Sequence, residues 1–252
     1  MKPSKVLGVL VTGLLWVYWL GAFVAGYWLV FLVAGLLRRR RGVAWALGNY
    51  TGAFFAVARL LIRGLRIDVP GRAQLRQTSG SVVVCNHVSL LDPLLLVSLL
   101  PGVITIVRPD FFRVPIFGWL LRGAGFLGPH LFAEGQPWID RVAQHLRSGG
   151  NLLVFPEGTR SRDGKLAPFK KGAFYLAKHL GAPILVLKVA GTDRVFPPGQ
   201  LTFNLAPVRP VEVRALACIG AVEAVDATTR ELTLRVHSLL AQGSATDTRP
   251  SC

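Results

Sequence analysis

A histidine and an aspartate lie five residues apart just after a strongly apolar run. Residues 81–85 (Ser-Val-Val-Val-Cys) are rich in β-branched side chains, which predict a buried strand. His87 follows this run, and Asp92-Pro93 opens the next apolar run with the residues of a helix N-cap and first turn. An imidazole can accept a proton near neutral pH. We expect His87 and Asp92 to share a strand-to-helix turn; the alternative is a plain loop histidine and a helix cap.

A second apolar run, at 151–155, ends in the polar turn Pro-Glu-Gly-Thr-Arg-Ser. Turn amides at Gly158, the hydroxyl of Thr159 and the guanidinium of Arg160 together suit a phosphate group, which Arg binds through its bidentate fork. Glu157 does not favour an anion, so we expect it to orient Arg160 or to bind a ligand hydroxyl. A plain surface turn is the alternative interpretation.

The other reactive side chains are less well placed for chemistry. Cys85 lies close to His87 in sequence, but its strand context predicts a side chain inside the sheet, which disfavours a Cys–His nucleophile. The five histidines show no metal-ligand spacing, so we expect no metal and no bound cofactor. The chain contains no Gly-x-Ser-x-Gly segment, which disfavours a serine hydrolase.

From residue 81 onward, patterns typical of strands and helices alternate. Strands are expected at 81–85, 103–107, 151–155 and 183–190, and helices near 93–100, 115–122, 137–147, 170–180 and 227–241. Thr228 and Glu231 form a capping-box pattern at the start of the last helix. Residues 201–219, interrupted by Pro207 and Pro210, predict further strand at a sheet edge. The alternation predicts an α/β fold with a mixed, largely parallel sheet flanked by helices.

The N-terminal segment is long and apolar, with no charge at 6–37. One helix of this length would reach ~48 Å, beyond a ~30 Å hydrocarbon core, whereas two full spans need ~40 residues and a turn. We expect a tilted or broken single span or, preferably, a hairpin that enters one leaflet. Basic residues at both ends place the flanks in the cytoplasm, and the length disfavours a cleaved signal peptide.

Basic residues concentrate near this apolar segment. The net charge is +16, and residues 1–66 hold nine Lys and Arg but no Asp or Glu. This pattern favours an anionic lipid surface over nucleic acid as the partner. Residues 43–66 predict a helix that lies at the interface or, equally, in the core. We divide the chain into a membrane helix or hairpin (1–42), an interfacial helix and linker (43–80), a catalytic domain (81–241) and a disordered tail (242–252).

Two of these segments together resemble the glycerolipid acyltransferase family. Asn86-His87-x-x-x-x-Asp92 is followed some seventy residues later by Phe155-Pro156-Glu157-Gly158-Thr159-Arg160-Ser161, in the order and spacing of that family. The resemblance covers about residues 80–215 and is nearest to the 1-acylglycerol-3-phosphate acyltransferases. Further matching stretches lie at 114–119, 168–173 and 182–186.

The resemblance implies transfer of a fatty acyl group from a thioester, acyl-CoA or acyl carrier protein, to the free hydroxyl of 1-acylglycerol-3-phosphate (lysophosphatidate). The product would be phosphatidic acid, made at the cytoplasmic face of the cell membrane. It implies His87 as general base and Asp92 as its orienting partner. Arg160, Arg108 and Lys171 would hold the acceptor phosphate.

One departure leaves the acceptor open. His130 lies near the position where the family has an arginine involved in phosphate binding, although Arg108 and Arg122 could supply the charge. The same chemistry on another lyso-lipid or an acylated amino-acid lipid is therefore an alternative. A non-catalytic lipid-binding protein and a thioesterase are alternatives from other classes.

Overall fold

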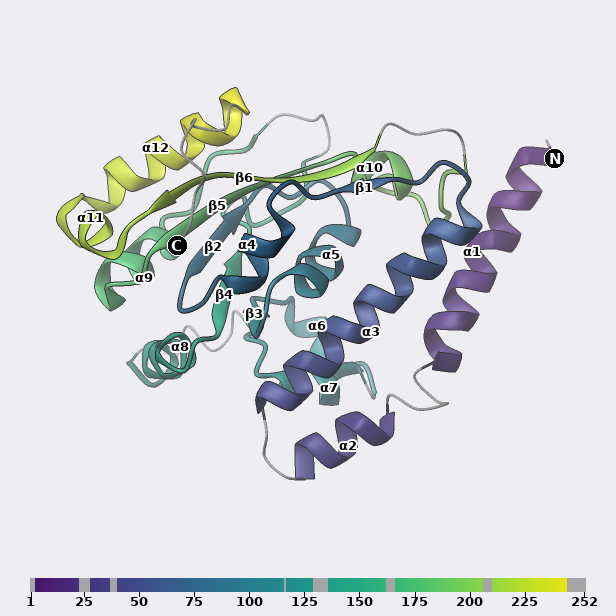
Figure 1. Ribbon diagram of the computed structural model, residues 1–252, viewed down its shortest axis with the longest axis horizontal. Helices are drawn as coiled ribbons and strands as arrows, with labels where there is room; N and C mark the ends of the chain where they lie inside the picture. The colour runs from purple at the N-terminus through teal and green to yellow at the C-terminus, as the bar shows by residue number, and fades with distance from the viewer. Residues whose placement is uncertain are drawn as a thin grey trace.

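A mixed six-stranded sheet organises the computed structural model, which describes residues 3–22, 28–36, 40–115, 117–128, 136–161, 166–205 and 210–243 (Figure 1). The strands are β1 (Ile67–Asp68), β2 (Val82–Cys85), β3 (Val103–Thr105), β4 (Asn151–Val154), β5 (Ile184–Ala190) and β6 (Val211–Ile219). Their order across the sheet is β1-β6-β5-β2-β4-β3, and every neighbouring pair is parallel except β5 and β6. The predicted mixed, largely parallel α/β sheet is confirmed.

Helices precede, connect and follow these strands. They are α1 (Pro3–Ala22), α2 (Trp28–Leu36), α3 (Arg40–Leu61), α4 (Arg72–Gln77), α5 (Leu91–Leu99), α6 (Pro109–Arg113), α7 (Phe117–Ala124), α8 (Gln136–Arg147), α9 (Gly172–Leu180), α10 (Thr192–Val195), α11 (Ala221–Asp226) and α12 (Thr229–Gln242). Figure 1 shows α9, α11 and α12 at one end of the molecule and α1 to α3 at the other.

The central strands are buried because parallel strands need cover on both faces. All four residues of β2 and all four of β4 are buried. Helix α5 connects β2 to β3, and a right-handed crossover places it on one face of the sheet. Helices α8 and α9 belong to connections that run across the sheet in the opposite direction, so they lie on the other face. The carboxyl ends of β2 and β4 therefore lie side by side, and the turns that follow both strands meet at one edge of the sheet.

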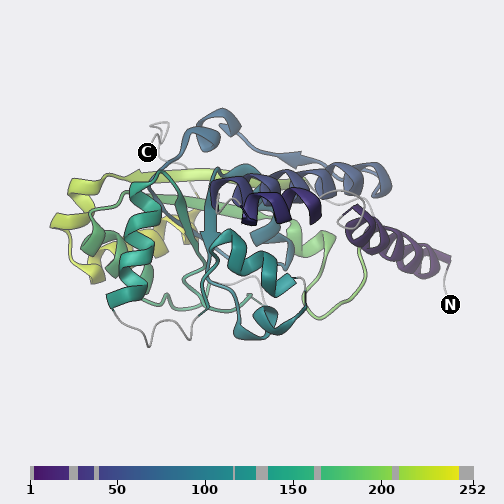
Figure 2. The same cartoon turned by 90° about the horizontal axis from the view of Figure 1, so that it is seen from below.

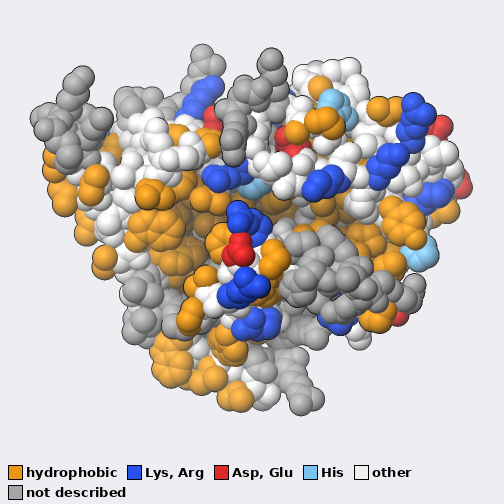
Figure 3. Space-filling model, turned by 180° about the vertical axis from the view of Figure 1, so that it is seen from behind, with side chains coloured by type: hydrophobic (Ala, Val, Ile, Leu, Met, Phe, Trp, Pro, Cys, Tyr) orange, Lys and Arg blue, Asp and Glu red, His pale blue; other side chains and the backbone are white. Residues whose placement is uncertain are grey.

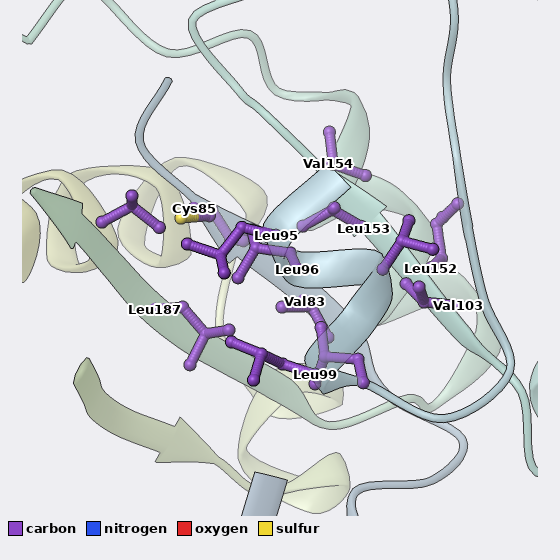
Figure 4. Packing of buried hydrophobic residues seen from close by; sticks show 14 of the residues in the cluster. Val83, Cys85, Leu95, Leu96, Leu99, Val103, Leu152, Leu153, Val154 and Leu187 are labelled. Carbon is purple, nitrogen blue, oxygen red and sulfur yellow. The ribbon is translucent and has the colours of Figure 1, made fainter. Parts of the chain in front are cut away.

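Helix α5 packs its leucines directly onto the sheet. Figure 4 shows Leu95, Leu96 and Leu99 lying over Val83 of β2 and Leu153 of β4. Each of these side chains is at most 3% exposed. Each fully buried Leu contributes ~1.5–3 kcal/mol through the hydrophobic effect. These contacts fix the position of α5 on the sheet.

The apolar run at 6–37 divides into two helices, α1 and α2. Along the described residues, no helix combines the length and the apolar character that crossing a membrane requires. Helix α1 packs on α3, where the Tyr50 hydroxyl donates to the carbonyl of Trp19 and the Trp19 and Phe54 rings meet edge to face. The hydroxyl of Thr12 accepts from the amide of Phe203 at 2.8 Å, which ties α1 to the segment that follows α10.

Two sequence expectations about flanking segments need correction or refinement. Helix α3 is a core helix along one face, with Val43, Tyr50 and Phe54 buried, while Trp45 and Leu60 stay exposed. Strand β6 was expected at the sheet edge but lies between β5 and β1; Pro210 directly precedes it, so no ladder amide is lost. The short strand β1 occupies the edge instead.

Of the other expectations about the chain, one is confirmed and the rest are not tested by the described residues. The capping box of Thr228 and Glu231 is confirmed at the start of α12. Pro207 and the end of the predicted tail, 244–252, lie outside the described residues. The domain boundaries at 42, 80 and 241 stay predictions; α3 and the sheet share one hydrophobic core.

Candidate active site

His87 and Asp92 form a hydrogen-bonded pair in the turn between β2 and α5. His87 Nδ1 lies 2.9 Å from Asp92 Oδ2, and the side chains are 16% and 0% exposed. An ionised carboxylate can only accept, so Nδ1 carries the proton and donates it. Nε2 has no hydrogen-bond partner among the described residues and is left to accept a proton from a bound molecule.

The carboxylate of Asp92 is the centre of this turn. Its Oδ2 also accepts from the amides of Val88 (2.7 Å) and Ser89 (2.8 Å), and its Oδ1 accepts from the hydroxyl of Thr192 (2.5 Å). Four donors stabilise a charge that burial alone would make costly. The expectation that Asp92 is the N-cap of the helix is wrong: the N-cap of α5 is Leu90, and Asp92 points back to amides that precede the helix.

The turn after β4 holds the backbone of His87 from two sides. Glu157, 3% exposed, accepts from the amide of His87 at 3.0 Å through Oε1 and from the amide of Ala167 at 3.1 Å through Oε2. The amide of Ser161 donates to the carbonyl of His87 at 2.8 Å. Glu157 is thus a support for the His87 backbone, and the predicted contact of Glu157 with substrate stays a prediction.

Two more side chains define the surroundings of the imidazole. The ring of Phe155 stacks on the ring of His87, with centroids 4.3 Å apart and planes inclined at 26°. Cys85 is fully buried, and burial first, then the negative charge of Asp92, raises the pKa of its thiol well above the ordinary value. A thiol held neutral inside the sheet is not a nucleophile.

Basic and polar groups surround the 157–161 turn. Gly158 has a φ of +70°, which favours glycine, and a Cβ there would lie 2.7 Å from Nζ of Lys170. The side chain of Lys170 therefore rests against Gly158. Thr159 is exposed, with its hydroxyl donating to the Arg160 carbonyl at 3.2 Å, and Arg160 is half-buried. An exposed turn with Arg160 in it and Lys170 beside it suits an anionic group.

The remaining cations that were considered for binding have no described contact with the 157–161 turn. Arg108, at the N-cap of α6, is exposed and pairs with Asp110 at 2.6 Å. Lys171 is an exposed residue at the N-cap of α9. Arg122 donates to the carbonyl of Phe112 at 2.8 Å. The described contacts tie none of these three cations to the 157–161 turn, and His130 lies outside the described residues.

The sequence interpretation missed Thr192, Lys170 and the role of Phe155. Thr192 is a hundred residues from Asp92, in a segment without a recognisable motif. Lys170 stands beside Lys171, and only the observed path of the chain after 166 distinguishes the two. Phe155 follows an apolar strand and was interpreted as part of it.

Comparison with known proteins assigns one segment of the chain to a family. Residues 66–189 match the family model described as "Acyltransferase". This segment is an acyltransferase domain. It contains the His87–Asp92 pair, the 157–161 turn and strands β1 to β5 up to Val189.

The relatives of the acyltransferase domain carry one activity in their names. A chloroplastic 1-acyl-sn-glycerol-3-phosphate acyltransferase (BAT2) of Brassica napus is 34% identical over 139 residues, which cover 54% of this chain and 40% of that protein. The human 1-acyl-sn-glycerol-3-phosphate acyltransferase alpha is 33% identical over 169 residues, covering 59% and 56%. The chain thus spans about two fifths to three fifths of the length of these relatives.

A solved structure shares the fold of the whole chain. The 1-acyl-sn-glycerophosphate acyltransferase PlsC from Thermotoga maritima superposes with a TM-score of 0.74 at 23% identity, covering 95% of each chain. The N-terminal helices outside the acyltransferase domain are therefore part of a shared architecture.

Proposed function

We propose that the protein is a 1-acylglycerol-3-phosphate O-acyltransferase that converts lysophosphatidate to phosphatidic acid. The observation that carries this proposal is the His87–Asp92 pair, which leaves Nε2 open beside a basic turn, inside an acyltransferase domain. The names of its relatives support lysophosphatidate as the acceptor. The fatty acyl donor is a thioester of coenzyme A or of acyl carrier protein.

In the proposed reaction, His87 acts as the general base. Nε2 takes the proton of the acceptor hydroxyl as that oxygen bonds to the thioester carbon. The tetrahedral intermediate then collapses, the carbon–sulfur bond breaks, and the leaving thiolate takes the proton from Nε2. Asp92 holds the imidazole in the tautomer with Nδ1 protonated and stabilises the imidazolium that forms, as in hydrolytic triads. Backbone amides at 157–159 are the proposed donors to the oxyanion.

The acceptor phosphate binds at the 157–161 turn in this proposal. Arg160 and Lys170 supply positive charge there, and the missing side chain at Gly158 lets the Lys170 ammonium lie against the turn. Arg108 and Lys171 contribute longer-range charge. No cofactor or metal takes part in the proposed steps.

We further propose that α1 and α2 seat the protein on the cytoplasmic surface of a membrane. Large apolar side chains are exposed along both helices: Val6, Leu7, Val9, Leu10, Leu14, Trp16 and Val17 on α1, and Trp28, Leu29, Val30, Val33 and Leu36 on α2. Figure 3 shows apolar side chains over the left and lower edges of the rear face, where these helices lie, and Lys and Arg side chains nearer its middle. Exposed apolar area with adjacent basic charge favours an anionic lipid surface.

A direct assay tests the proposed activity. Purified protein in detergent is incubated with oleoyl-CoA, or with acyl carrier protein carrying the same chain, and with lysophosphatidate; phosphatidic acid and free thiol are measured together. We expect one thiol released per phosphatidic acid. Free fatty acid without a lyso-lipid would indicate a thioesterase, and no turnover of any thioester would favour a lipid-binding protein.

A panel of acceptors tests the head group. The pairing of Arg108 with Asp110 motivates this test, because it leaves fewer free cations for a phosphate. We expect transfer to lysophosphatidate to exceed transfer to lysophosphatidylcholine and to an acylated amino acid. Transfer to one of these other acceptors, without transfer to lysophosphatidate, would overturn the choice of acceptor but not the mechanism.

A further inference from the structure

Thr192 is a buried hydroxyl that contacts the carboxylate of the active-site pair from outside the active-site turn. It begins α10, separated from the end of β5 by Gly191 alone, and is 0% exposed. Its Oγ1 lies 2.5 Å from Asp92 Oδ1. The described residues offer that oxygen no other hydrogen-bond donor, whereas Oδ2 serves His87, Val88 and Ser89 together.

The backbone places Thr192 firmly at this position. Gly191, which precedes it, has a φ of +85°, and a Cβ there would lie 2.8 Å from the carbonyl oxygen of Pro210. A second contact, independent of Thr192, joins α10 to the same turn: the Ser89 hydroxyl donates to the carbonyl of Phe196 at 2.9 Å. Loss of the Thr192 hydroxyl would therefore leave α10 attached to the active-site turn.

We propose that Thr192 is a positioning residue for the His87–Asp92 pair. By holding Oδ1, its hydroxyl stops rotation of the carboxylate, so that Oδ2 stays in line with Nδ1 of His87. The same hydrogen bond stabilises negative charge on Oδ1, so the carboxylate attracts the protonated imidazole of His87 less strongly. The role in turnover rests on the proposed acyl transfer, whereas the effect on His87 rests on geometry alone.

The charged groups near this pair, which include Arg160 and Lys170 at the 157–161 turn, are unchanged in the variants below, so a change at Thr192 can be read in the titration of His87. Glu157 bonds to the amide of His87 and, through its other oxygen, to Ala167. The Cys85 thiol is buried and kept neutral. Asp193, half-buried, and Arg194, exposed, follow Thr192 on α10, and both are unchanged in the variants below.

The test compares Thr192→Val, which keeps the shape but removes the donor, with Thr192→Ser, which keeps the donor. The valine variant is expected to lose about tenfold in kcat, the worth of one hydrogen bond to a charged group, with KM for both substrates unchanged. The acidic limb of its rate profile should move up by ~0.5–1 pH unit, because more carboxylate charge then favours the imidazolium. The serine variant should stay within about twofold of the unmodified protein.

A matched control and a second measurement keep the result unambiguous. Thr105→Val removes another buried hydroxyl, which donates to the carbonyl of Leu153 in the sheet, and should leave the rate profile unchanged. Should the protein transfer no acyl group to any acceptor, the proposed function fails, and NMR titration of the His87 ring still tests Thr192. An unshifted His87 titration in Thr192→Val, or a serine variant as impaired as the valine variant, would overturn the proposal.

Discussion

The chemistry proposed for His87 depends on which ring nitrogen is engaged. Nδ1 is bonded to Asp92, so Nε2 has to be the proton acceptor. Replacing His87 by Ala is expected to lower kcat by about 10²–10⁴-fold, the usual contribution of a general base. His179→Ala is a suitable control, because that histidine is exposed on α9 and stacks on Tyr175. Transfer rates equal in both variants would exclude His87 as the base.

Glu157 provides a second test at the residue scale. In Glu157→Gln, one side-chain oxygen becomes an NH₂ group that faces the amide of either His87 or Ala167, so one buried donor loses its acceptor. The free energy of unfolding should fall by ~1–3 kcal/mol, and kcat should fall with KM for the acceptor unchanged. Denaturant unfolding and steady-state kinetics measure the two effects.

Glu212→Gln is the matched control for this test. Glu212 pairs with Arg214 on the partly exposed strand β6, away from His87 in sequence. It should change neither quantity appreciably, since exposed ion pairs contribute ~0–1 kcal/mol. A Glu157→Gln variant with raised KM and unchanged kcat would instead indicate that Glu157 binds the substrate directly.

The local part of the site could be predicted from the sequence, and the distant part could not. His87 and Asp92 are close in the chain, and a strand-to-helix turn brings them together whatever the rest of the fold does. Thr192 reaches Asp92 only because β5 lies next to β2 in the sheet, and strand order is not encoded in any short pattern. The sequence predicted that Glu157 belongs to the site. It did not predict the partners of Glu157, because these are backbone amides, which no side-chain pattern reveals.

At the scale of elements, the hydrophobic pattern predicted the sheet well. The expected strands at 81–85 and 151–155 match β2 and β4 to within one residue, because continuous apolar runs are typical of strands buried on both faces. Strand β1 was not predicted, since two residues, Ile67–Asp68, leave no periodicity to detect. The predicted position of β6 at the sheet edge was wrong, because Pro210 precedes the strand and does not interrupt it.

The capping box of α12 gives a prediction for stability against pH. The amide and hydroxyl of Thr228 both donate to Glu231, at 2.7 and 2.8 Å, and these bonds lower the pKa of the Glu231 carboxyl from its ordinary value of 4.5. A carboxyl with a lowered pKa in the folded protein contributes stability above its unfolded pKa, and that contribution is lost as the pH falls through the folded pKa.

Glu231→Gln should accordingly lower Tm at pH 7 and have a smaller effect at a pH below the lowered pKa of the folded carboxyl, where the group is protonated in both states. Thermal unfolding followed by circular dichroism measures the difference. Glu223→Gln serves as the control, because Glu223 makes an exposed ion pair with Arg235 and caps no helix. A Glu231→Gln effect of equal size at both pH values would contradict a role for the charge.

At the scale of the whole molecule, α1 presents an apolar stripe to the outside. Leu7, Leu10, Leu14 and Val17 are between 55% and 69% exposed, and their spacing of three and four residues puts them on one face of the helix. Val11 and Leu15, which point to another side of the helix, are buried in the shared core. An apolar stripe held by a packed inner face is typical of a helix that lies along a surface.

If this stripe binds lipid, two acidic substitutions in it should detach the protein from vesicles. We expect Leu10→Glu with Leu14→Glu to reduce co-flotation with vesicles rich in phosphatidic acid by at least about tenfold, because each change removes buried apolar area worth ~1.5–3 kcal/mol and adds repulsion from anionic lipid. The matched control is Val222→Glu with Leu234→Glu: both residues are exposed, on α11 and α12, which Figure 2 also shows at the end of the molecule away from α1. Equal loss of flotation in both pairs would mean that negative charge alone, and not the α1 stripe, determines binding. Loss confined to the α1 pair, with transfer to detergent-dispersed lysophosphatidate unchanged, would separate membrane seating from the chemistry at His87.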